Sequence, residues 1–186
     1  MSNPLSPDCD DAILVRACLN GERDAHALLL ARYRDRIYGF ILRMLRDRGA
    51  AEDLAQEVFI KAFRSLSSYD QERPFIPWLF RIARNAVIDY TRKRKADIDP
   101  IEFDLPDASP SVEDVVASKL EVELVEKMLG ALPFDFREAL LLHLGEGLGY
   151  AEMSEVLGVP VGTLKARVSR AREMLRKKCN PEPESP

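Results

Sequence analysis

The side chains best able to do chemistry in this chain are long cations and aromatic rings, which gather in two segments. Six basic residues and one acidic residue lie between Arg81 and Lys95, a net charge of +5, and seven basic residues and one acidic residue lie between Thr163 and Lys178, a net charge of +6. Arginine and lysine bind phosphates and base edges, and aromatic rings stack on unpaired bases. These residue types predict recognition of nucleic acid.

Residues that could support catalysis are not arranged for it. A nuclease needs clustered carboxylates or a nucleophile with its base, and neither pattern is apparent in the sequence. The three cysteines, Cys9, Cys18 and Cys179, are far apart, and His26 and His143 have no neighbours at the spacing of metal ligands. We therefore expect no enzyme activity, no metal or other cofactor, and no small-molecule substrate.

The charge of the chain is unevenly distributed. The net charge of -4 argues against a nucleic-acid binder when it is taken alone. Residues 96–126, however, contain ten acidic residues and one lysine, a net of -9, and lie between the two basic segments. A basic, acidic, basic order predicts two nucleic-acid modules joined by an acidic linker.

The elements that position the first basic segment are predicted to be helices. Apolar residues recur at helical spacing and hairpin turns are lacking, so we expect an all-α fold. Residues 11–45 indicate two helices broken near Asn20–Gly21, and a third begins near Ala51. Residues 67–77 form a polar loop with two prolines. In the helix that follows, one face carries Trp78, Arg81, Asn85 and Arg92.

The second basic segment is predicted to belong to a helix-turn-helix. Residues 149–157 indicate a short helix, Gly158-Val159-Pro160 a turn, and the next helix buries Val161, Leu164, Val168, Ala171 and Leu175. Its opposite face carries Gly162, Ala166, Ser169, Arg170 and Glu173, flanked by Thr163 and Lys165. An ordinary helix pair with a solvated basic face is the alternative. The small residues Gly162, Ala166 and Ser169 allow this face to approach DNA closely, which favours binding in the major groove over the alternative.

Several motifs, in order along the chain, resemble those of the bacterial RNA polymerase sigma factors. They are Asp53 to Phe59 (DLAQEVF), Phe75 to Asn85 (FIPWLFRIARN), Gly149 to Glu152 (GYAE) and Val161 to Arg167 (VGTLKAR). The chain has no room for the central domain of housekeeping sigma factors. The small extracytoplasmic-function (ECF) group is therefore the closest match, which implies a transcription initiation factor.

The resemblance implies region 2 at 11–95 and region 4 at 119–178. Composition predicts an acidic flexible linker between them at 96–118 and a disordered tail at 179–186. Region 2 implies binding to core RNA polymerase, recognition of the minus-ten element and promoter melting. Region 4 implies recognition of the minus-thirty-five element.

The resemblance also implies roles for particular residues. Those expected to bind core polymerase are Asp53, Gln56 and Glu57. Those expected to contact minus-ten DNA are Tyr69, Trp78, Arg81, Arg84, Asn85 and Arg92, with Tyr69 capturing a flipped base and Trp78 either stacking or belonging to the core. Those expected to contact minus-thirty-five DNA are Thr163, Lys165, Ala166, Arg167, Ser169 and Arg170.

The expected partners are core polymerase, promoter DNA and an anti-sigma factor, which relatives commonly anchor in a membrane. The N-terminal sequence lacks the basic and apolar regions of a signal peptide, so we expect a cytoplasmic protein. The alternative function is a one-component helix-turn-helix regulator. That alternative leaves the DLAQE segment and the basic, aromatic helix after it unexplained.

Overall fold

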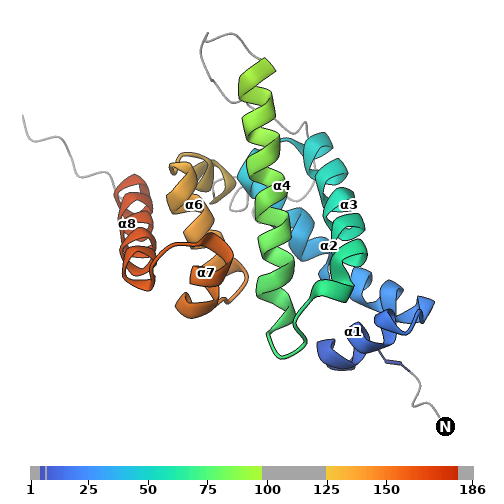
Figure 1. Ribbon diagram of the computed structural model, residues 1–186. Helices are drawn as coiled ribbons and strands as arrows, with labels where there is room; N and C mark the ends of the chain where they lie inside the picture. Colours follow the sequence, from blue (N-terminus) through green and yellow to red (C-terminus); the bar gives the residue numbers. More distant parts are fainter. Residues whose placement is uncertain (1–4, 7, 98–124, 180–186) are drawn as a thin grey trace, which may run out of the picture. The chain divides into compact units, whose positions relative to one another are not determined.

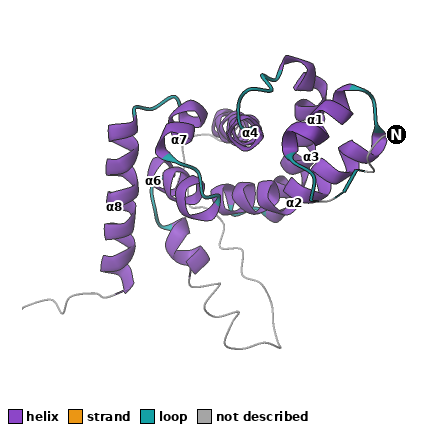
Figure 2. Cartoon of the chain, turned by 90° about the horizontal axis from the view of Figure 1, so that it is seen from below, coloured by secondary structure: helices purple, strands orange, loops and turns teal. Residues whose placement is uncertain are grey.

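The structure is a computed structural model that describes residues 5–6, 8–97 and 125–179, without the side chains of 95–97 and 179. In that part every element is a helix and no strand occurs, which confirms the predicted all-α class (Figure 2). None of the described helices is long and apolar enough to cross a bilayer. The predicted linker and tail lie outside the described residues, apart from 96–97 and 179.

The chain divides into two compact units (Figure 1). The first contains α1 (Asp11–Leu19), most of α2 (Arg23–Leu45), α3 (Arg48–Ser65), the 3-10 turn η1 (Leu66–Ser68) and α4 (Phe75–Asp97). Gly21 separates α1 from α2 with a φ of 82°, a conformation that glycine adopts without a steric penalty. The helix break predicted near Asn20–Gly21 is therefore confirmed.

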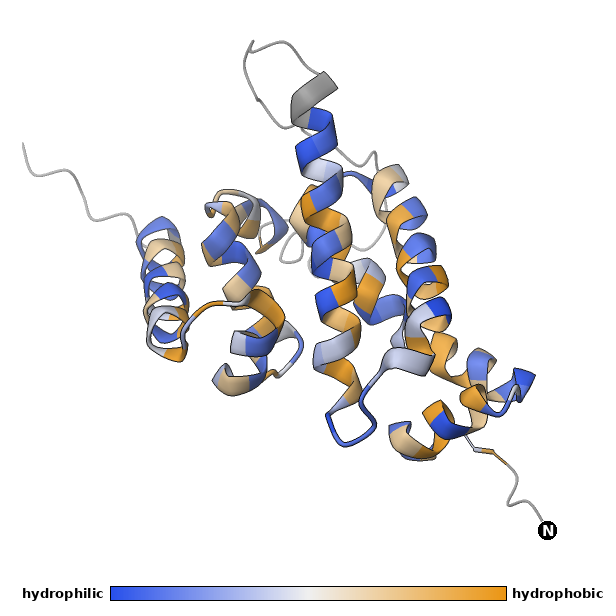
Figure 3. Ribbon diagram, viewed as in Figure 1, coloured by the Kyte–Doolittle hydropathy of each residue, from blue (hydrophilic) through white to orange (hydrophobic). Residues whose placement is uncertain are grey.

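The core of the first unit lies mainly between α3 and α4. On α3 Leu54, Ala55, Val58, Phe59 and Ala62 are buried and Phe63 is half-buried, and on α4 Leu79, Ala83 and Val87 are fully buried. Phe40 of α2 meets Phe80 of α4 edge to face at a centroid distance of 5.4 Å. Figure 3 shows the resulting orange apolar positions along both helices, with blue polar positions between them.

α4 begins earlier than the sequence suggested. The polar loop was expected to extend to Pro77, but the helix starts at Phe75 and Pro77 lies in its first turn. Proline is compatible with that turn because the first backbone N–H groups of a helix have no partner within the helix. The early start places both Phe75 and Trp78 in the first turn.

The second unit contains helical residues 125–130, α6 (Phe134–Leu140), the π-helical turn η2 (Leu141–Gly145), α7 (Tyr150–Leu157) and α8 (Val161–Cys179). Apolar residues recur at helical spacing over 115–132, of which 115–124 lie outside the described residues. α6 and η2 were not predicted from the sequence. The π-helical turn ends in a loop in which Gly147 has a φ of 73°.

α7 and α8 form the predicted helix-turn-helix. Gly158 ends α7 with a φ of 66°, and the Ser154 hydroxyl donates a 2.8 Å hydrogen bond to the Val159 carbonyl in the turn. At the other end of α7, the backbone N–H of Gly149 donates to the Glu152 carboxylate at 2.7 Å. Leu164, Val168 and Ala171 are buried on the inner side of α8 as predicted, whereas Val161 and Leu175 are only half-buried.

Candidate functional site

A groove of about 680 Å³ runs between α2 and α3 on the surface of the first unit. Its apolar residues include Leu30, which is 37% exposed, and Ile60, which is 50% exposed. The other residues of this α2–α3 groove are Arg34, Asp35, Tyr38, Glu52, Ala55, Gln56, Phe59 and Phe63. Exposed apolar side chains surrounded by polar ones are typical of a protein-binding surface.

The structure places the three predicted polymerase-binding residues on the exposed side of α3. Gln56 lines the α2–α3 groove, whereas Asp53 and Glu57 do not. Glu57 forms an ion pair with Lys61 at 2.8 Å, one helical turn further on. The sequence reasoning missed the contribution of α2. Leu30 and Ile60 could have indicated it, because both are apolar residues on the otherwise polar sides of their helices.

Four aromatic side chains, Tyr33, Tyr69, Phe75 and Trp78, form a continuous cluster at the start of α4. The ring centroid of Phe75 lies 5.6 Å from those of Tyr33 and Tyr69 and 5.5 Å from that of Trp78. Tyr69 and Trp78 are 5.1 Å apart. We call these four residues the aromatic cluster.

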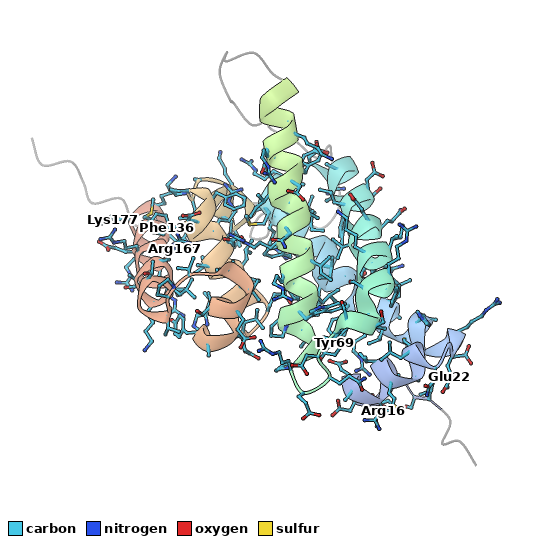
Figure 4. The ribbon with its side chains drawn as sticks, viewed as in Figure 1. Arg16, Glu22, Tyr69, Phe136, Arg167 and Lys177 are labelled. Carbon is cyan, nitrogen blue, oxygen red and sulfur yellow. The ribbon has the colours of Figure 1, made fainter. Side chains whose placement is uncertain are left out.

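Tyr69, predicted to capture a flipped base, is packed inside this cluster. It is 8% exposed, and its hydroxyl donates a hydrogen bond to the Arg73 carbonyl. Figure 4 labels Tyr69 near the lower end of α4. Burial raises the pKa of Tyr69, and the carboxylates of Asp11 and Asp70 raise it further. A base could reach this ring only if the turn shifts.

The remaining predicted minus-ten residues follow α4 in the expected order. Arg81 and Asn85 are exposed, and Arg84 is half-buried. Arg92 is exposed and pairs with Asp89 one turn earlier, an arrangement that contributes little to stability at the surface. Trp78 is half-buried, so it belongs partly to the cluster and partly to the surface.

On α8, five of the six predicted minus-thirty-five residues share the exposed face. These are Thr163, Lys165, Ala166, Ser169 and Arg170. Lys165 places its ammonium 5.8 Å from the ring centroid of Tyr150, the first residue of α7. Tyr150 in turn stacks on His143 at 4.5 Å, and the His143 ring donates from Nδ1 to the Leu148 carbonyl at 3.0 Å.

Arg167 differs from the other five. Its side chain is 21% exposed, and its Nη2 lies 2.7 Å from the Oδ2 of Asp135 on α6. Figure 4 labels Arg167 on the part of α8 that lies beside α6. Arg167 was predicted to contact DNA, but its side chain forms an ion pair within the second unit.

Comparison with known proteins explains both units. The family model for Sigma-70 region 2 matches residues 29–96, and the model for Sigma-70 region 4 matches residues 123–175. SigW, an ECF RNA polymerase sigma factor of Bacillus subtilis, is 35% identical over 175 residues, which cover 88% of this chain and 93% of SigW. The chain belongs to the ECF sigma factors.

Solved structures agree with that assignment. CnrH, in complex with the cytosolic domain of CnrY, matches with a TM-score of 0.72 at 26% identity, over 93% of this chain and 99% of the solved one. The sigma factor RpoE of Bartonella quintana, in complex with the anti-sigma factor NepR, matches with a TM-score of 0.69 at 29% identity, over 80% and 92%.

As an ECF sigma factor, the protein directs RNA polymerase to promoters and is not an enzyme. The family match to residues 29–96 explains the DLAQE segment and the basic, aromatic helix, which the one-component regulator could not explain. The predicted family and class of function are therefore confirmed.

Proposed function

We propose that this sigma factor uses three separate surfaces. The α2–α3 groove, with Gln56 inside it and Asp53 and Glu57 beside it, binds core polymerase. The aromatic cluster and the exposed side of α4 bind the minus-ten element, and the exposed face of α8 binds the minus-thirty-five element. The exposed face of α8 is the observation that carries the promoter-reading part of this proposal.

The composition of the α2–α3 groove supports a basic protein partner. Exposed Leu30 and Ile60 supply apolar area that a partner can bury, and the carboxylates of Asp53 and Glu57 lie on the same helix as Gln56. Such a surface fits a helix that carries apolar and basic side chains together.

The chemistry of α4 supports single-strand binding. Arg81 and Arg92 can follow backbone phosphates, and Asn85 can read a base edge. Stacking of an unpaired base on an aromatic ring contributes about 1 to 3 kcal/mol, and the partly exposed Trp78 and the enclosed Tyr69 are the rings available at this end of the helix.

The exposed face of α8 supports binding in the major groove. Gly162 and Ala166 allow close approach, while Lys165 and Arg170 are long enough to reach guanine edges or phosphates. Arg167 then serves a different purpose, because its ion pair with Asp135 fixes the position of α8 against α6.

We further infer that a protein inhibitor covers these surfaces in the cytoplasm. RpoE is solved with the anti-sigma factor NepR, and CnrH is solved with the cytosolic domain of CnrY. A partner whose cytosolic domain binds a sigma factor is compatible with the membrane-anchored anti-sigma factor expected here.

The test is transcription in vitro with purified core polymerase on a fragmented genomic library. We expect transcripts from a small set of fragments that share two elements at constant spacing. Lys165→Ala or Arg170→Ala should then weaken promoter use by about 1 to 3 kcal/mol in a manner that depends on the minus-thirty-five sequence. If both variants transcribe like the wild type, the assignment of α8 is wrong.

A further inference from the structure

The carboxylate of Asp11, the first residue of α1, binds two consecutive residues of α2. Its Oδ1 accepts from Arg32 Nη1 at 2.6 Å, and its Oδ2 accepts a hydrogen bond from the Tyr33 hydroxyl. Arg32 also donates from Nη2 to the Cys9 carbonyl at 2.5 Å. The start of α1 is thus attached to the middle of α2 by three hydrogen bonds.

This attachment is shielded from water. The side chains of Arg32 and Asp11 are 25% and 22% exposed, and Tyr33 is 2% exposed. Charge-assisted hydrogen bonds of this kind are stronger than those between neutral groups and are less screened by salt than surface pairs. Burial and the bond to Asp11 both raise the pKa of Tyr33, so its hydroxyl stays protonated and remains a donor.

Tyr33 connects this attachment to the aromatic cluster. Its ring is 5.6 Å from that of Phe75, which contacts both Tyr69 and Trp78. Burial raises the pKa of Tyr69, and the Asp11 carboxylate raises it further. A continuous path of packed groups therefore leads from α1 to the two rings that we assign to the minus-ten element.

We propose that Asp11 is a positioning residue for minus-ten recognition: by holding Tyr33 against Phe75, it keeps enclosed Tyr69 packed against Trp78 and so preorganises half-buried Trp78 as a stacking surface for an unpaired base. This inference depends on the proposed role of the aromatic cluster. Without the carboxylate, the rings sample more arrangements, and the binding of a base has to order them. Affinity for single-stranded minus-ten DNA then falls.

The chain offers a built-in reporter, because Trp78 is its only tryptophan. In Asp11→Ala we expect the Trp78 emission of the free protein to shift to longer wavelength and to become more accessible to acrylamide. Tyr33→Phe keeps the ring but removes the donor, so it should give a smaller change. Asp24→Ala removes an exposed first-turn carboxylate from α2 and should leave the emission unchanged.

The functional measurement uses holoenzyme and a fluorescent oligonucleotide with the non-template minus-ten sequence of a mapped promoter. We expect Asp11→Ala to bind it about five- to tenfold more weakly than the wild type, and Asp24→Ala to bind it equally well. Asp11→Asn keeps a neutral acceptor for Tyr33 and should recover part of the affinity. All variants are compared at a temperature at which circular dichroism shows them fully folded.

The outcomes separate this inference from the function on which it depends. If the wild-type holoenzyme does not distinguish the minus-ten oligonucleotide from a scrambled one, the proposed function of the cluster fails and the inference fails with it. If the wild type distinguishes them and folded Asp11→Ala binds with wild-type affinity and unchanged Trp78 emission, the inference alone is wrong. If Asp11 only stabilises the fold, Asp11→Ala should lower the unfolding temperature without changing the Trp78 emission or the affinity for the oligonucleotide.

Discussion

Arg167 of α8 and Asp135 of α6 form an ion pair of 2.7 Å between Nη2 and Oδ2. The arginine is the less exposed partner, at 21% against 58% for the aspartate. The inner residues Leu164 and Val168 come from the same stretch of α8 and are buried. The ion pair therefore fixes α8 against α6, beside the buried residues of α8 and next to its exposed face.

We expect Arg167→Ala to lower the free energy of unfolding of the second unit by about 1 kcal/mol, since the pair is only partly shielded from water. Asp135→Asn should reproduce most of that loss, because it removes the same interaction from the other side. Chemical denaturation of the purified variants measures both. Arg170→Ala, which is exposed on the same helix, is the matched control and should be as stable as the wild type.

The transcription assay decides between positioning and direct contact. If Arg167 positions α8, Arg167→Ala and Asp135→Asn should both reduce transcription from all promoters to a similar degree. If Arg167 instead reads a base, its loss depends on the minus-thirty-five sequence and Asp135→Asn has no effect on transcription.

A second prediction concerns Lys165 and Tyr150. An exposed cation–π contact is worth about 0.5 to 1 kcal/mol, so Tyr150→Leu should reduce promoter use roughly two- to fivefold by freeing the lysine side chain. Tyr150→Phe keeps the ring and should retain wild-type activity. In the double variant Tyr150→Leu with Lys165→Ala, the two effects should not add, because both act through one side chain. Additive losses would argue against the contact.

Periodicity was sufficient to predict α3, α4 and α8 and most of their buried residues, because each apolar stripe follows the helical repeat. It could not predict that α4 begins at Phe75, since proline in the first turn of a helix and proline in a loop look alike in sequence. The burial of Tyr69 depends on Phe75 and Trp78, which pack against it only after the chain turns back. Arg167 has a partner 32 residues away, and no local pattern encodes that pair.

The α2–α3 groove provides a third prediction. Gln56→Ala combined with Glu57→Lys should weaken binding to core polymerase without changing the helix content, because both side chains are exposed on α3. Affinity for core and circular dichroism are measured together. Asp24→Lys makes the same charge change at an exposed position of α2 outside the groove, and it should bind like the wild type. Equal affinities for the two variants would contradict the assignment of this surface.

A fourth prediction follows from the burial of Cys18. Burial, with a smaller contribution from the Glu22 carboxylate, raises the pKa of this thiol from 9.0 to about 11. The thiolate is the reactive form, so at pH 8 maleimide should label Cys18 about tenfold or more slowly than half-buried Cys9, as measured by peptide mapping.

The same shift in pKa has a consequence for stability. The folded state favours the neutral thiol, so its contribution is complete below the ordinary pKa of 9.0 and is lost as the pH rises towards about 11. Cys18→Ala removes this titration, and its free energy of unfolding should therefore fall less than that of the wild type between these pH values. Rapid labelling of Cys18 in the folded protein would contradict the burial seen here.

The final prediction concerns the order in which the surfaces act. Free protein should bind duplex promoter poorly, because its net charge is -4 and residues 96–126, with a net of -9, can compete with DNA for the basic faces of α4 and α8. Core polymerase should draw the acidic segment away from the two DNA-binding surfaces and hold these surfaces at a fixed distance from each other.

Binding of one surface to its element then raises the effective concentration of the other surface at its own element, so promoter affinity should depend sharply on the spacing of the two elements. Anisotropy on a mapped promoter, with and without core and with spacers changed by a few base pairs, measures both effects. Tight, sequence-specific binding by the free protein would show that core is not needed to expose these surfaces, and equal affinity at every spacing would show that they do not act together.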